Sequence, residues 1–130
     1  MQTYNPHHHT LILLKDFLNS MQQGFPFNQS ELEESDQSFL EQLIQVIQLL
    51  EEHHVDASFE GQSWLSRLFR NYPSLAPHLG REVLWYFGGE ALHFMPDEEI
   101  AKFQKLDDLL AEGDENFDYL AAKQSIFQAQ

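Results

Sequence analysis

Two pairs of glutamate and histidine are spaced so that both side chains of a pair could bind one metal ion. The sequence "EEHH" places Glu51 three residues before His54, and "EALH" places Glu90 three residues before His93. On an α-helix, residues three apart lie on the same face. Imidazole and carboxylate groups are both common metal ligands. These four residues are therefore the candidates for a metal site.

The two pairs resemble the Glu-x-x-His motifs of ferritin-like di-iron and di-manganese bundles, in which two further helices each supply a glutamate. The resemblance covers only those four residues, because the first predicted helix offers Asp16 alone and the third offers Glu60 near its start. With 21 acidic residues and seven histidines in the chain, such pairs also arise by chance. We therefore predict no cofactor, with transition-metal ions as the alternative.

The sequence lacks the common nucleophile and phosphate-binding motifs. "GQSWL" at 61–65 lacks the second glycine of a nucleophile elbow. "FGGEAL" at 87–92 follows no predicted strand, as a phosphate-binding loop would. The absence of cysteine excludes thiolate zinc sites and a cysteine nucleophile. We predict no catalytic residue and expect that the protein is not an enzyme.

The segment 61–95 is the candidate for a contact with another protein. It holds both tryptophans and all three arginines, and these residue types are enriched in binding hot spots. Trp85, Tyr86 and Phe87 follow one another and must point in three directions around a helix, so they cannot all face one core. The alternatives are a thick intramolecular core and a homodimer face. The predicted partner-binding residues are Trp64, Arg67, Arg70, Trp85 and Tyr86.

The charge of the chain limits its partners. The net charge is -14, and residues 31–60 contain nine acids and no lysine or arginine. A protein of this charge has few cationic side chains that could bind nucleic-acid phosphates or anionic membranes. We therefore predict neither as a partner. The simplest role of the acidic surface is solubility. The alternative is a nucleic-acid mimic that binds a basic protein.

The chain shows no signal for export or for a membrane span. Its N-terminal stretch has no basic start, and the apolar run "LILL" is too short for a signal peptide. No segment approaches the ~18 apolar residues of a spanning helix. We therefore predict a cytoplasmic protein.

The pattern of apolar residues predicts one all-α domain over residues 1–130, built as a compact bundle or an orthogonal array of about six helices. The first helix should begin at Asn5 and Pro6 and end at Gly24. The fifth should begin at Pro96 and end at Gly113. The second should start at a capping box of Ser30 and Glu33 or later at Ser35, the third at Asp56 or Ser58, and the sixth at Asp114.

The fourth segment is ambiguous. Apolar periodicity runs from Ser74 to Pro96 through Gly88 and Gly89, which favours one continuous but weakened helix over a helix that ends at the glycines. The predicted core-facing residues of the third and sixth helices are Trp64, Leu65, Leu68, Phe69, Tyr72, Phe117, Leu120, Ala121 and Phe127.

Overall fold

The computed structural model describes residues 4–113 and 117–128. These residues form α-helices and two short 3-10 helices with no strand, so the predicted all-α fold is confirmed. None of the described helices combines the length and the apolar character that a membrane crossing demands. The elements are α1 (Pro6–Gln22), α2 (Glu34–Glu51), α3 (Ala57–Asn71), η1 (Ala76–His78), α4 (Arg81–Phe87), η2 (Gly89–Phe94), α5 (Asp97–Glu112) and α6 (Tyr119–Gln128).

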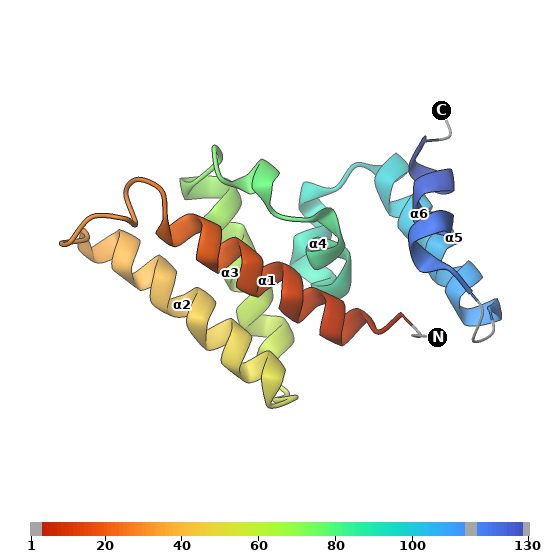
Figure 1. Ribbon diagram of the computed structural model, residues 1–130, viewed down its shortest axis with the longest axis horizontal. Helices are drawn as coiled ribbons and strands as arrows, with labels where there is room; N and C mark the ends of the chain where they lie inside the picture. Colours follow the sequence, from red (N-terminus) through yellow and green to blue (C-terminus); the bar gives the residue numbers. More distant parts are fainter. Residues whose placement is uncertain (1–3, 114–116, 129–130) are drawn as a thin grey trace.

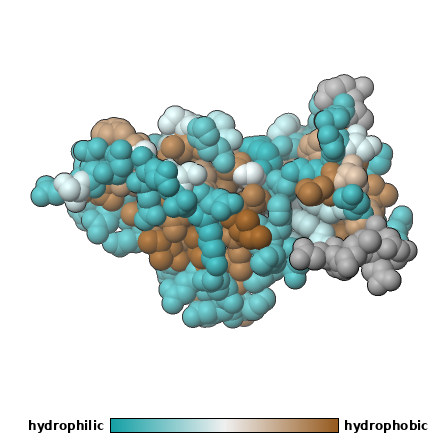
Figure 2. Space-filling view, viewed as in Figure 1, coloured by the Kyte–Doolittle hydropathy of each residue, from teal (hydrophilic) through white to brown (hydrophobic). Residues whose placement is uncertain are grey.

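The helices are arranged as a main body and a hairpin beside it (Figure 1). In the body, α1 and α2 run antiparallel, α3 packs on α2, and α4 packs on α1 and α3. The hairpin consists of α5 and α6, and the N-terminal end of α1 reaches toward it. Hydrophobic residues reach the surface over α1 and α2 (Figure 2), two helices that carry the partly exposed Ile12 and Ile44.

Trp64 lies at the centre of the core. Its ring stacks on Phe39 of α2 at 5.3 Å and meets Phe17 of α1 edge-on at 5.7 Å. Leu65 and Leu68, also on α3, have no exposed surface. Burying these large side chains is the main favourable term in folding the body.

Local signals fix the start of α1 and both ends of α5 as predicted, whereas α1 ends at Gln22, before the predicted Gly24. The side chain of Asn5 accepts a hydrogen bond from the His8 backbone N–H at 3.1 Å, and Pro6 occupies the first turn. α5 follows Pro96, has three acidic residues in its first turn and ends before Gly113. Acidic residues near a helix N-terminus interact favourably with the helix dipole.

The predicted starts of α2 at Ser30 or Ser35 are wrong, because the helix begins at Glu34. The preceding loop is longer than the capping pattern suggested. Phe27 inserts its ring among Phe39 and Tyr72 at 6.0 and 5.7 Å, which keeps the loop folded against the core.

The predicted continuous helix over 74–95 is also wrong. Gly88 has φ 63° and ψ -152°, a conformation that is essentially restricted to glycine, and Gly89 has φ 51°. α4 therefore ends at Phe87, and the 3-10 helix η2 turns back toward α3. Gln62 of α3 holds this turn, since its amide donates to the Phe87 carbonyl at 3.1 Å and accepts from the Glu90 N–H at 3.3 Å.

The sixth helix differs from its prediction in the residue that it buries. The predicted start at Asp114 lies outside the described residues. Asp118 accepts a hydrogen bond from the Ala121 N–H at 3.1 Å. Leu120 was predicted to face the core but is 70% exposed, whereas Tyr119 is 7% exposed. Tyr119 takes that place because its ring stacks on Tyr4.

Replacing Gly88 with alanine should destabilise the protein by about 1–3 kcal/mol, because an L side chain is strained at this backbone conformation. The free energy of unfolding in urea measures this cost. Gly24→Ala is the matched control, because φ is not positive there and the nearest atom to an added Cβ is 4.0 Å away. Equal stabilities of the two variants would contradict the assigned turn.

Candidate functional site

The predicted partner-binding residues separate into two groups in the structure. Trp64 has no exposed surface, so its prediction as a contact residue is corrected: α3 turns it into the core. Arg67 donates to Gln42 Oε1 at 2.8 Å and lies over the Phe39 ring, which ties α3 to α2. Arg70 is exposed on α3. None of these three residues lines the cavity described below.

Trp85 and Tyr86 lie together on α4 and are both half-buried. Trp85 stacks on Phe103 of α5 at 5.7 Å, and its indole N–H donates to Asp107 Oδ2 at 2.9 Å. Phe87 is buried in the body, and the ring of Tyr86 meets it edge-on at 5.5 Å. The three consecutive aromatic residues therefore do take different directions.

A cavity of about 170 Å³ adjoins Trp85 and Tyr86. It is built from four separate segments, since the N-terminal residues, α4, α5 and α6 all contribute to its wall. Four of the lining residues are aromatic and two are acidic: Tyr4, Trp85, Tyr86, Tyr119, Glu82 and Asp107. This cavity is the candidate functional site.

Glu82 is the most deeply placed charged group of the cavity, with 11% of its side chain exposed. Its Oε2 accepts a hydrogen bond from Lys123 of α6 and lies 3.3 Å from His9 Nε2 of α1. Burial raises the pKa of Glu82, but the hydrogen bond and charge of Lys123, a backbone N–H and His9 together hold the pKa below its usual range. Glu82 is therefore ionised at neutral pH.

Two tyrosines form another part of the wall. The rings of Tyr4 and Tyr119 are parallel within 3°, with centroids 3.5 Å apart. Burial raises the pKa of Tyr119, and the neighbouring Tyr4 and the acidic charges raise it further. Burial also raises the pKa of Tyr4. Both phenols are therefore uncharged at neutral pH and add no negative charge to the cavity.

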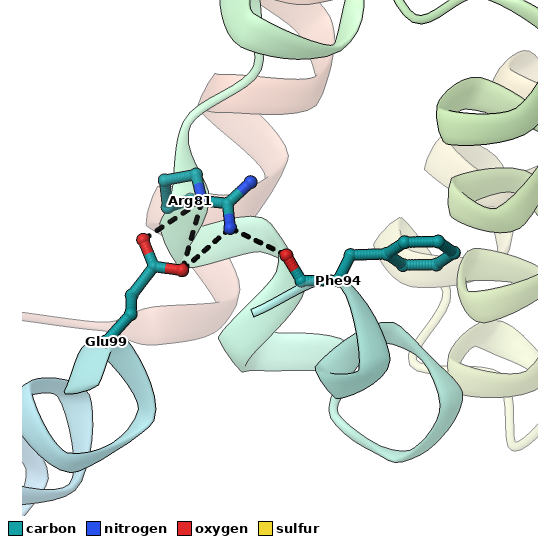
Figure 3. A network of polar contacts seen from close by, with 3 residues as sticks. All are labelled: Arg81, Phe94 and Glu99. Atoms are coloured by element: carbon teal, nitrogen blue, oxygen red, sulfur yellow. Dashed lines mark hydrogen bonds and ion pairs between the residues drawn. The ribbon is translucent and has the colours of Figure 1, made fainter. Parts of the chain in front are cut away.

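Arg81 connects the main body to the start of the hairpin (Figure 3). Its Nε donates to both Glu99 oxygens at 3.2 and 3.0 Å, and its Nη2 donates to Glu99 Oε1 at 2.7 Å. The same Nη2 donates to the Phe94 carbonyl at 2.9 Å. One guanidinium thus joins α4, the end of η2 and the start of α5.

The two Glu-x-x-His pairs do not form the alternative metal site. Among the described residues, no group of three or more His, Asp or Glu side chains lies close enough to hold one ion. Glu51 instead accepts from Lys15 at 2.8 Å, and His54 lies 3.7 Å from Asp56. Glu90 and His93 are 3.5 Å apart, and about three quarters of each side chain is exposed. Glu51 and His54 lie at and just after the end of α2, whereas Glu90 and His93 lie on η2, so the two pairs belong to different segments.

Sequence reasoning missed Tyr4, Glu82, Asp107 and Tyr119, which complete the cavity. They lie in four segments of the chain that no motif connects. The available signals were a tyrosine just before the cap of the first helix and an acid on the same face of the fourth helix as Trp85, and neither identifies a cavity on its own.

The comparisons place the chain in a family without adding a function. A family model described as PA2817-like matches residues 2–130. The chain belongs to the PA2817-like family. No curated protein and no solved structure matches it.

Replacing Glu82 with glutamine should destabilise the protein by about 1–3 kcal/mol at pH 7, because Lys123 loses its ionised acceptor in a mostly buried site. The folded-state pKa lies below the value of 4.5 for an unperturbed glutamate. The contribution of Glu82 is thus full above pH 4.5 and is lost as the pH falls through the folded-state pKa.

Urea unfolding at neutral and at acidic pH measures this effect. The difference between wild type and Glu82→Gln should shrink in acid. Glu31→Gln, an exposed position in the loop before α2, should leave stability nearly unchanged at both pH values. A difference that grows in acid would contradict the assigned shift of the pKa.

The pair of Arg81 and Glu99 should show a coupling free energy of about 1–2 kcal/mol in a double-mutant cycle with glutamine at each position, because its hydrogen bonds are bidentate. Lys15 and Glu51 provide the control, since both side chains are about half exposed. A solvated pair should couple by no more than about 0.5 kcal/mol. Equal coupling of the two pairs would show that Arg81 does not fix the hairpin.

Proposed function

We propose that this PA2817-like protein is a non-catalytic module that binds another protein through the cavity and its rim on α4. The observation that carries the proposal is that Trp85 and Tyr86 are both partly exposed beside a cavity built from four segments. Tryptophan and tyrosine are enriched in binding hot spots, where they fill or line pockets at the centre of an interface.

Polar contacts fix the shape of the site. Glu82 already accepts from Lys123 and lies against His9, and the indole of Trp85 donates to Asp107. These contacts hold the carboxylates in place and join the segments of the wall, as a recognition site requires.

The acidic surface supports a basic partner. The net charge of -14 would steer such a partner toward the protein. Arg70 stays a predicted contact residue outside the cavity, whereas Trp64 no longer belongs to the proposed face. The cytoplasm is the proposed place of action. Mimicry of a nucleic acid is an alternative that rests on the net charge alone.

A second copy of the chain is the other proposed partner, as the homodimer hypothesis states. A dimer that uses Trp85 and Tyr86 would have twice the 15.2 kDa mass of one chain. Light scattering of wild type and of Tyr86→Ser separates the two cases. A dimer that dissociates in the variant would identify the partner as the chain itself.

Replacing Tyr86 with serine should lower the affinity for the partner by about tenfold or more, because truncating a hot-spot residue costs about 2 kcal/mol or more. Affinity purification from the native cell, followed by mass spectrometry and titration with the purified partner, measures this loss. Phe59→Ser is the matched control, because Phe59 is an aromatic residue on α3 that is 71% exposed.

The expected result is one protein that is recovered with wild type and with Phe59→Ser but is lost with Tyr86→Ser. Circular dichroism should show the same helix content in all three proteins. A partner that Tyr86→Ser retains and Phe59→Ser loses would place the contact face elsewhere and overturn the proposal.

A further inference from the structure

The charges around the cavity do not balance. Two carboxylates, Glu82 and Asp107, line it, and no lysine or arginine of the described residues does. Lys123 compensates Glu82 from beside the cavity. Asp107 receives only the neutral indole N–H of Trp85 among the described residues, and a neutral donor does not cancel its charge. At the α5 side of its wall the cavity therefore has an exposed carboxylate that no cation of the described residues pairs with.

The aromatic rings add to this preference for a cation. The face of an aromatic ring carries partial negative charge, and tryptophan attracts cations most strongly. Four of the lining residues are aromatic, and Trp85 is next to the carboxylate of Asp107. Cages of this kind are suited to ammonium groups, whose charge is surrounded by apolar carbon. An anion would meet two carboxylates here.

The size of the cavity limits the group that can enter. Its volume of about 170 Å³ is close to the ~150 Å³ of an apolar cavity that binds benzene. A group of about five or six non-hydrogen atoms therefore fits. The end of a lysine side chain and a small quaternary amine are both of this size.

We propose that the cavity between α4 and the α5–α6 hairpin binds an alkylammonium group, with Trp85 and Tyr86 as its aromatic wall and Asp107 as its counter-charge. This inference rests on the proposed function, because the source of the ammonium group that we favour is a lysine side chain of the protein partner. A free small amine is the other source of the same chemistry.

The indole N–H of Trp85 reports on binding because it donates to Asp107. Two-dimensional ¹H–¹⁵N NMR of the full chain should show this signal shifting in a saturable way with choline and with Nα-acetyl-lysine methylamide, whose side-chain ammonium is free. The dissociation constant should be on the order of 1 mM, as small ligands of few atoms allow. The neutral isosteres, 3,3-dimethyl-1-butanol and acetyl-norleucine methylamide, should produce little shift. The buried Trp64 indole is the internal reference.

Asp107→Asn should weaken choline binding by about fivefold or more, while it keeps an acceptor for the indole. Asp108→Asn, one residue further along α5 and outside the cavity wall, should not change the affinity. The spectra of both variants without ligand report on whether the fold is intact. Equal effects of the two substitutions would overturn the role of Asp107.

The outcomes separate this inference from the proposed function. Equal shifts with the neutral isosteres, or no saturable shift with either ammonium compound, would overturn the ammonium site even if the partner is still captured through Tyr86. Binding of choline without acetyl-lysine methylamide would support the site and assign a free amine as its ligand. Binding of both, without any protein partner, would support the site and overturn the proposed function.

Discussion

The position of the α5–α6 hairpin depends on the guanidinium of Arg81. This group donates two parallel hydrogen bonds to the Glu99 carboxylate. It also donates a hydrogen bond to the Phe94 carbonyl at the end of η2. A lysine could not do the same, because its ammonium is a point charge without a planar fork of donors. By fixing the start of α5, Arg81 also determines where Phe103 meets Trp85 and where Asp107 meets the indole N–H.

The turn at Gly88 provides the second constraint. It ends α4 after two turns and lets η2 return to α3, where Phe94 stacks on Phe69 at 4.5 Å. The Phe94 carbonyl reaches Arg81 only because the chain reverses at this glycine. The glycine conformation and the arginine network are therefore parts of one arrangement, and a change at Gly88 should be felt in the hairpin as well as in the body.

The sequence was sufficient where a single local signal decides the structure. Asn5 and Pro6 begin α1, and Pro96 and Gly113 bound α5, because caps and breakers act within one turn. Periodicity misled the assignment of 74–95, since apolar spacing continues through a 3-10 turn. The cavity could not be predicted, because Tyr4 and Tyr119 are near opposite ends of the sequence. Only tertiary packing brings their rings together.

The run of Trp85, Tyr86 and Phe87 shows how one short segment serves both the fold and the proposed site. Phe87 packs so closely on α3 that a Cβ at Gly61 would lie 2.5 Å from its ring, so it locks α4 to the body. Trp85 holds the hairpin through Phe103 and Asp107. Tyr86 contacts Phe87 but holds neither connection. Substitutions at Phe87 and Trp85 should therefore alter the fold together with binding, whereas Tyr86 is the position at which recognition can be changed while the helices keep their arrangement.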